Sequence, residues 1–132
     1  MNVPSEDIKD MLIDDSGLGL SFATNLFIGA EPYSPKNCVT IFDTYGQPPD
    51  LGLTNQGYER PAIQIRVRNK SYIDGWTLAN DIKDLLHGRN HETWNGALYT
   101  VIYCSSGPAL LDWDDNNNAR FIINFYMQRR AV

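Results

Sequence analysis

The chain has 132 residues, of which 42% are apolar and 20% are charged, and its formal net charge is −5. This length fits one domain with its own core and excludes two ordinary domains. No apolar run approaches the roughly 18 residues that a membrane span needs. The acidic first residues lack the basic and apolar regions of a signal peptide, so we expect synthesis in a cytoplasm.

The charge is distributed unevenly along the chain. Residues 1–59 carry nine acidic and two basic side chains, whereas residues 60–132 carry nine basic and seven acidic ones. The acidic half argues against binding nucleic acid by phosphate neutralisation. It suits an association in which an acidic face meets a basic one, although surface charge kept for solubility explains it equally well.

The first predicted element is a short helix that begins at Pro4, with Ser5 as its N-cap, and stops at Gly17. Its apolar stripe consists of Ile8, Met11 and Leu12. Two strands are expected next, over residues 21–28 and 37–43.

Residues 44–59 (TYGQPPDLGLTNQGYE) contain two prolines and three glycines, which is typical of an irregular connection. Loops of this length are uncommon in compact domains and tend to be functional or disordered. We expect a projecting loop that becomes ordered on assembly.

The stretch from residue 60 to residue 88 predicts a strand, a tight turn and an amphipathic helix. In the strand at 61–68, apolar residues alternate with charged or polar ones, so one face of the sheet is expected to be apolar and the other charged. Ser71 and Asp74 have the spacing of a capping box, and Gly88 ends the helix. The expected apolar stripe of this helix consists of Ile73, Trp76, Ala79, Ile82, Leu85 and Leu86.

Two further strands are expected, over residues 97–104 and 120–129, and residues 105–118 between them are rich in turn-forming residues. The element order predicts a single α+β domain over residues 1–132. Its sheet has four to five strands, is mostly antiparallel, and carries the main helix on one face beside the short N-terminal helix. A mixed sheet stays open as an alternative, because the main helix can serve as a crossover connection.

No catalytic, cofactor-binding or metal-binding constellation is found in the sequence. The segment His91–Asn95 has asparagine where a zinc-protease helix needs its second histidine. The segment from Asp112 to Asn118 lacks the glycine and glutamate of an EF-hand calcium loop, so a strand-connecting turn is favoured. We therefore predict no enzyme activity, cofactor or metal. Cys38 and Cys104 lie in apolar runs and are predicted to be reduced core thiols.

Four arginines share predicted strand faces: Arg66 and Arg68 on one strand, and Arg120 and Arg130 on the last. If the two strands belong to one sheet, these arginines form a basic patch. Two interpretations remain open: pairing with acidic residues of a neighbouring subunit, or a solvent-exposed face with intrachain ion pairs of small energy. Further interface candidates are the loop aromatics Tyr45, Tyr58 and Trp113, because aromatic anchors dominate contact energies.

The element order, the strand PAIQIRVRNKSY, the helix ending LLHG and the closing segment ALYTVIYCSSGPALLDWDDNNNARFIINFYMQRR together resemble the bacteriophage minor capsid or tail terminator family. The likeness covers nearly the whole chain and rests on element order and patterning. It implies a small α+β virion protein that forms a ring, typically a hexamer, at the head-proximal end of a long non-contractile tail. The family has no catalytic residues. Its contacts through sheet edges and loops place Arg66, Arg68, Tyr45 and Asp50 among the interface candidates.

The resemblance also implies the partners: further copies of the chain, the tail-tube protein and a head-completion or connector protein. DNA is expected to pass through the ring without specific binding, and no membrane is involved. The closest alternative is a neck or head-closure connector. An alternative from a different class is a small-molecule-binding α+β domain, which needs a concave pocket with convergent polar groups.

Overall fold

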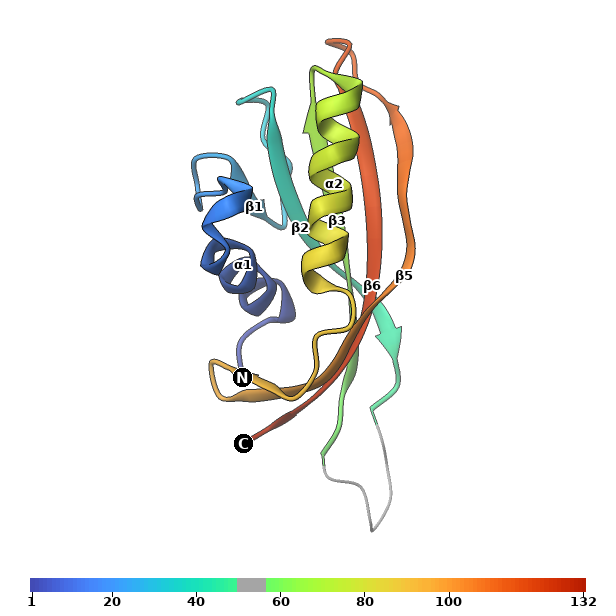
Figure 1. Ribbon diagram of the computed structural model, residues 1–132. Coiled ribbons are helices and arrows are strands. Elements are labelled where there is room, and N and C mark those ends of the chain that lie inside the picture. The colour runs from blue at the N-terminus through green and yellow to red at the C-terminus, as the bar shows by residue number, and fades with distance from the viewer. Residues whose placement is uncertain (50–56) are drawn as a thin grey trace.

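The computed structural model describes residues 1–49 and 57–132 (Figure 1). The described residues form two helices and six strands, with a short 3-10 turn at Ser16–Leu18 after the first helix. The elements are α1 (Pro4–Asp14), β1 (Leu26–Ile28), β2 (Cys38–Gln47), β3 (Arg60–Asn69), α2 (Tyr72–Leu86), β4 (Glu92–Trp94), β5 (Ala97–Trp113) and β6 (Ala119–Ala131).

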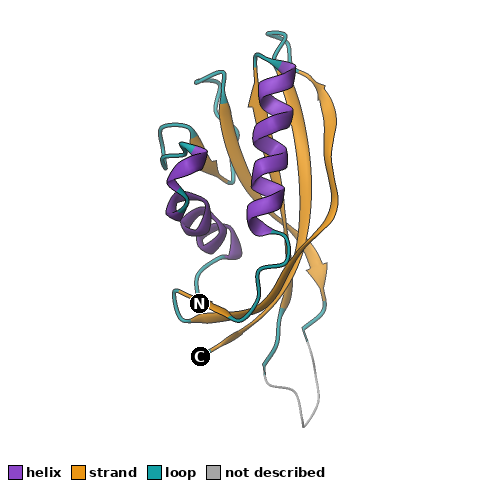
Figure 2. Cartoon of the chain, viewed as in Figure 1, coloured by secondary structure: helices purple, strands orange, loops and turns teal. Residues whose placement is uncertain are grey.

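The six strands form one mixed sheet in the order β1-β2-β3-β6-β5-β4. Only β1 and β2 are parallel, and all other neighbouring strands are antiparallel. Both helices lie on the same side of this sheet, and the other side carries no helix (Figures 1 and 2). The α+β class and the mostly antiparallel sheet are confirmed. The prediction of four to five strands missed β4, which is only three residues long.

Strand β5 is much longer than predicted, and it contains most of the segment expected to be a turn. Residues 105–113 continue the ladder with β6, with register shifts that accommodate Gly107 and Pro108. At Gly107 the backbone has φ +95°, and a Cβ there would lie 2.5 Å from the carbonyl oxygen of Ile122. The ladder therefore overrides the local turn preference, because pairing with β6 satisfies the backbone hydrogen-bonding groups. Only residues 114–118 form the turn.

The start of α1 differs from the prediction. Val3 is the N-cap and Pro4 the first helical residue, while Ser5 lies inside the helix and is buried. Ser5 instead donates its hydroxyl to Asp43 Oδ2 at 2.7 Å, and its backbone N–H lies 3.1 Å from Asp43 Oδ1. Asp43 on β2 thus satisfies the free N–H at the helix start, which fastens α1 to the sheet.

The N-terminus of α2 agrees with the prediction, because the Ser71 hydroxyl accepts a hydrogen bond from the Asp74 backbone N–H. Its apolar stripe was predicted too broad. The buried positions are Gly75, Ala79, Ile82 and Leu86. Ile73 and Trp76 point into solvent, being 71% and 45% exposed.

Strand β2 continues to Gln47, which pairs with Arg60 on β3, so the predicted irregular loop at 44–59 begins later than expected. The paired ends of β2 and β3 lie at the lower end of the molecule in Figure 1. Residues 50–56 of this loop, including Asp50, lie outside the described residues.

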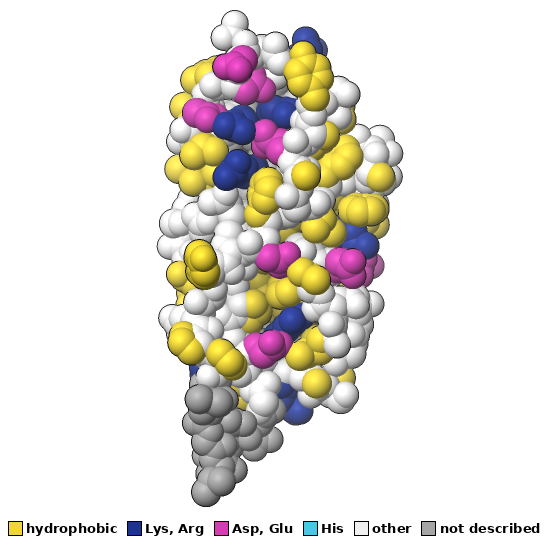
Figure 3. Space-filling model, turned by 180° about the vertical axis from the view of Figure 1, so that it is seen from behind, with side chains coloured by type: hydrophobic (Ala, Val, Ile, Leu, Met, Phe, Trp, Pro, Cys, Tyr) yellow, Lys and Arg dark blue, Asp and Glu magenta, His cyan; other side chains and the backbone are white. Residues whose placement is uncertain are grey.

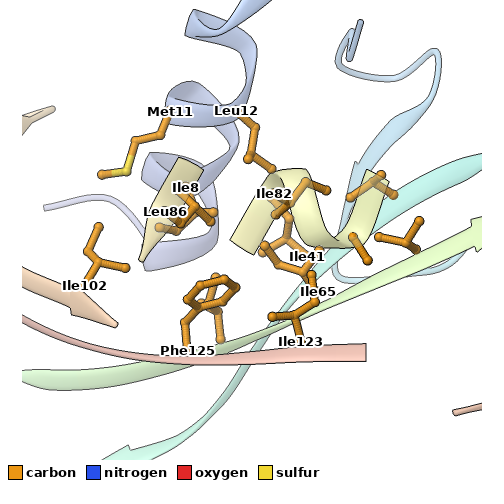
Figure 4. Packing of buried hydrophobic residues seen from close by; sticks show 14 of the residues in the cluster. Ile8, Met11, Leu12, Ile41, Ile65, Ile82, Leu86, Ile102, Ile123 and Phe125 are labelled. Carbon is orange, nitrogen blue, oxygen red and sulfur yellow. The ribbon is translucent and has the colours of Figure 1, made fainter. Parts of the chain in front are cut away.

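The core lies between the helices and the covered face of the sheet (Figure 4). Ile8, Met11 and Leu12 of α1 face Ile82 and Leu86 of α2, as the N-terminal stripe predicted. The sheet contributes the alternate residues of its strands, including Ile63, Ile65 and Val67 of β3 and Phe121, Ile123 and Phe125 of β6. Burial of this apolar surface is the main driving force for folding.

A buried polar cluster joins the N-terminal helix to the far end of the sheet. The Tyr99 hydroxyl donates to the Asp7 carboxylate, which is fully buried. Arg129 Nη1 lies 3.1 Å from the Tyr99 hydroxyl oxygen and 3.4 Å from Asp7 Oδ2. Asn95 donates to Asp7 Oδ1 at 2.7 Å, and Arg129 Nε lies 3.2 Å from Glu59 Oε1. Burial and the hydrogen bond to Asp7 raise the pKa of Tyr99, so its hydroxyl stays protonated.

The substitution Arg129→Met is expected to lower the free energy of unfolding by about 3 kcal/mol, because it leaves the buried Asp7 charge without its cation. Denaturant unfolding monitored by circular dichroism measures this loss. Gln128→Met, one residue away on the opposite face of β6, is the matched control and should change stability by less than about 0.5 kcal/mol. If both variants lose the same amount, the buried pair does not hold the fold.

The substitution Gly75→Ala should destabilise the protein, although alanine usually stabilises the middle of a helix. A Cβ at Gly75 would lie 2.9 Å from Phe121 Cε2 and 3.0 Å from Asn69 Cβ, so α2 would have to move away from the sheet. We expect a loss of about 1–3 kcal/mol in thermal or denaturant unfolding. Thr77→Ala on the exposed side of the same helix should be neutral or slightly stabilising. An unchanged or raised stability of Gly75→Ala would disprove the close approach.

Candidate interaction surfaces

The side of the sheet without helices is called the open face here, and its centre is formed by outward-pointing side chains of β2, β3, β5 and β6 (Figure 3). Residues directly opposite one another in the ladders include Gln64 with Asn124 and Arg66 with Ile122. The predicted alternation of β3 is confirmed, since Ile63, Ile65 and Val67 are buried on the other side. Strands β3 and β6 are neighbours, so the four predicted arginines do lie on one side of one sheet.

Two of these arginines are neutralised within the chain. Arg68 and Arg120 are direct cross-strand partners. Glu31 Oε2 lies between them, 3.4 Å from Arg68 Nη1 and 2.9 Å from Arg120 Nη1. Asp112 completes the cluster with oxygens 2.6 Å and 2.5 Å from Arg120 Nε and Nη2. In Figure 3 basic and acidic side chains accordingly lie next to one another in the upper part of this face.

The electrostatics of this cluster follow from the hydrogen bonds. The Arg120 guanidinium lowers the pKa of Asp112, and the hydrogen bond to Asp112 raises the pKa of Arg120. Arg68 is buried and also donates to the carbonyl oxygens of Tyr33, Pro35 and Lys36. The loop before β2 therefore covers Arg68, whose side chain holds that loop against the sheet.

Arg66 has a different environment. Its guanidinium lies 4.8 Å from the centroid of the Phe42 ring, and its Nε donates to the neutral Gln64 at 2.9 Å. No carboxylate lies within ion-pair distance of Arg66 among the described residues. The pKa of the Asp112 carboxyl is lowered mainly by Arg120, and the charge of Arg66 contributes a smaller part. Arg66 is thus a half-buried cation that stacks on an aromatic ring and makes no direct ion pair among the described residues, so it can bind an anion outside the chain.

The remaining candidates are spread over the molecule. Arg130 lies at the opposite end of the open face from Arg120, with Leu98 as its ladder partner. Tyr45 on β2 is 99% exposed, while Tyr58 is half-buried. Trp113 is 50% exposed, and its ring stacks on Tyr72 with the centroids 6.0 Å apart. The structure therefore does not gather the seven candidates among the described residues into one site, and Asp50 lies outside the described residues.

The exposed side of α2, called the α2 ridge here, was missed by the sequence reasoning. It consists of Ile73, Asp74, Trp76, Thr77, Asp81 and Asp84. The sequence did contain a sign of this surface. The predicted apolar stripe is wider than the side that one helix can bury against a sheet, so some of its apolar residues had to be exposed. The small residues Gly75 and Ala79 lie on the buried side of α2. At Gly75 the missing side chain lets the helix approach Phe121 closely. The large apolar residues beside Gly75 and Ala79 are consequently left on the surface.

The edges of the sheet are poorly suited to adding a further strand. The outermost strands, β1 and β4, have three residues each. Where β5 continues beyond β4, its ladder with β6 has register shifts at residues 104–106, 106–109 and 110–112, so the strand is irregular there, and Pro108 has no N–H to donate. On the other side, β1 pairs only with Val39 to Ile41 of β2, so within the described part of the chain the rest of β2 up to Gln47 has a free edge, which ends at Pro48 and Pro49. Short, bulged and proline-containing edges are features that prevent edge-to-edge pairing.

The surface offers little to a small ligand or an ion. A hollow at the lower end of the open face, lined by Tyr103, Tyr126 and neighbouring residues, encloses about 100 Å³, below the usual range for ligand pockets. A larger groove of about 400 Å³ lies between the 3-10 turn and α2, but it is shallow and wide open to solvent. Among the described residues, no group of three or more histidine, cysteine or acidic side chains is arranged to hold a metal. In the turn after β5, Asp114 accepts hydrogen bonds from the N–H groups of Asn116 and Asn118, so the predicted turn is confirmed for residues 114–118, whereas Asp112 and Trp113 belong to β5.

The two cysteines are free thiols. Cys38 is buried and Cys104 is half-buried, and burial raises the pKa of both. No helix in the described part of the chain is long and apolar enough to cross a membrane.

Comparisons with known proteins identify the family. The sequence model of a protein family, the bacteriophage tail terminator proteins, matches residues 6–130. No curated protein matches significantly. Among solved structures, a chain of the virion of a native gene transfer agent particle shares the fold with a TM-score of 0.67 at 12% identity, and the match covers 96% of this chain and 93% of that one. The chain therefore belongs to the bacteriophage tail terminator family and is a structural protein of the virion.

Proposed function

We propose that this protein forms a ring at the head-proximal end of the phage tail, where it stops polymerisation of the tail tube and provides the surface that joins the head. The observation that carries the proposal is the family match, which extends over residues 6–130 and so includes α2, all but the first two residues of α1, and all but the last residue of the described sheet. The ring is expected to contain six copies, as the sequence resemblance implied.

The chemistry of the surface supports self-association in a ring. The helix side of the molecule and the open face differ in charge and composition. A contact between two different surfaces of identical subunits is heterologous, and it closes into a ring when the rotation between subunits divides a full turn. A molecule with one self-complementary surface would instead form a two-fold dimer.

The elongated shape supports a role between two different partners. The extended ends of β2 and β3 lie at one end of the molecule, and the β5–β6 turn lies at the other (Figure 1). The first end presents Tyr45, which is 99% exposed. The second presents the polar turn from Asp114 to Asn118. Ends of such different chemistry suit two different neighbours, the tube on one side and the head connector on the other.

The net charge of −5 suits a ring through which DNA passes without adhesion, because like charges prevent tight binding. The alternative role of a neck or head-closure connector differs in the partner that is bound first. A terminator binds the end of the tail tube in the absence of any head protein, whereas a head-closure protein does not.

The proposal predicts that the protein stops tube growth in vitro. Tail-tube protein from the same phage is polymerised with and without this protein, and tube lengths are measured by negative-stain microscopy. We expect a ring at one end of each tube and no further growth from that end when fresh tube protein is added. Tubes that grow equally long in both mixtures, with no end-bound ring, would contradict the proposal. Bovine serum albumin at the same concentration is the control for crowding.

A further inference from the structure

We propose that the α2 ridge of one copy is covered by the open face of a second copy, with Arg66 of the second copy meeting the aspartates of the ridge. This inference rests on the proposed ring and names the two surfaces that form its subunit contact. It commits to a second copy of this chain as the occupant of both surfaces.

The α2 ridge has apolar surface that the isolated chain does not use. Ile73 is 71% exposed and Trp76 is 45% exposed, and Trp76 lies one helical turn beyond Tyr72, which stacks on Trp113. Large apolar and aromatic side chains grouped in this way are typical of protein interfaces, where they supply most of the binding energy. Ile73 and Trp76 do not contribute to the core, because the buried side of α2 consists of Gly75, Ala79, Ile82 and Leu86.

The ridge is also acidic. Asp74, Asp81 and Asp84 lie on its exposed side. Lys83 is the cation on α2 and lies 3.3 Å from Asp84, so it neutralises one carboxylate at most. On α1, Lys9 is likewise occupied by its neighbour Asp10 at 3.2 Å. The helix side of the molecule therefore keeps an excess of negative charge.

The open face has the complementary composition. Arg66 rests on the Phe42 ring and has Ile122 as its ladder partner, so a cation stands among half-buried apolar side chains. Arg68 and Arg120 are already neutralised by Glu31 and Asp112. Arg66 is therefore the basic residue at the centre of this face that is available to a partner. When two surfaces meet, their apolar side chains supply affinity, and a pair of opposite charges across the contact fixes how the two subunits are aligned.

The arrangement in space makes the contact repeatable. The ridge and the open face lie on opposite sides of the same sheet (Figures 1 and 3). A contact between them leaves the open face of the first copy and the α2 ridge of the second copy unused, so that copies add head to tail until a ring closes. The short edge strands and the irregular part of β5 favour contact through the faces over strand addition, although the end of β2 keeps a free edge among the described residues.

A charge-swap experiment tests this contact. Self-association of the purified protein is measured by sedimentation velocity over a concentration series, and ring formation at tube ends is counted by microscopy. Arg66→Glu, Asp81→Lys and Ile73→Ser should each weaken association by about tenfold or more. The combination of Arg66→Glu with Asp81→Lys should recover part of the loss, because the opposite charges face each other again.

Lys9→Glu is the matched control, since it makes the same change of charge on α1, outside both surfaces, and should leave association unchanged. Thermal melting confirms that each variant is folded. If wild-type protein assembles and Arg66→Glu and Ile73→Ser assemble equally well, this contact is overturned and the surfaces serve other partners. If wild-type protein neither self-associates nor forms rings on tubes, the proposed ring itself fails.

Discussion

The structure depends on one buried interaction, in which Asp7 of the N-terminal helix is held by Tyr99 and Arg129 from the far end of the sheet. A buried carboxylate is tolerated only when its charge and hydrogen bonds are fully satisfied. The hydrogen bonds of Asp7 hold α1 against β5 and β6. Arg129 also contacts Glu59, the residue just before β3. With α1 fixed beside α2, one side of the sheet is covered and the other stays open. The two different faces of the molecule are thus a consequence of this cluster.

Local patterns in the sequence predicted much of this fold. The alternation in residues 61–68 and the Ser71 cap of α2 were confirmed, because they depend on neighbouring residues. The continuation of β5 through Gly107 and Pro108 was not predicted, since its cause is the ladder with β6. Ser5 was misassigned as a cap for a similar reason: its partner, Asp43, is 38 residues away and cannot be recognised from the local sequence.

The surfaces could be predicted only in part. The alternation correctly placed four arginines on one side of the sheet, but it did not reveal that Glu31, 89 residues before Arg120, neutralises two of them. That pairing separates Arg66 from Arg68 and Arg120, while Arg130 lies at the other end of the face, so Arg66 becomes the residue of interest. The α2 ridge was hidden in the sequence for the opposite reason. Ile73 and Trp76 fit the apolar period of the helix, so they were assigned to a core that has no room for them.

The central claim is that subunits meet through their faces and that the sheet edges remain free. Hydrogen exchange followed by mass spectrometry, comparing the free protein with protein bound at tube ends, tests this claim most directly. The account predicts slower exchange in residues 72–84 of α2 on assembly and no change in residues 105–113 of β5. Strong new protection of residues 105–113, with α2 unchanged, would show that the subunits join by strand addition and would contradict the account.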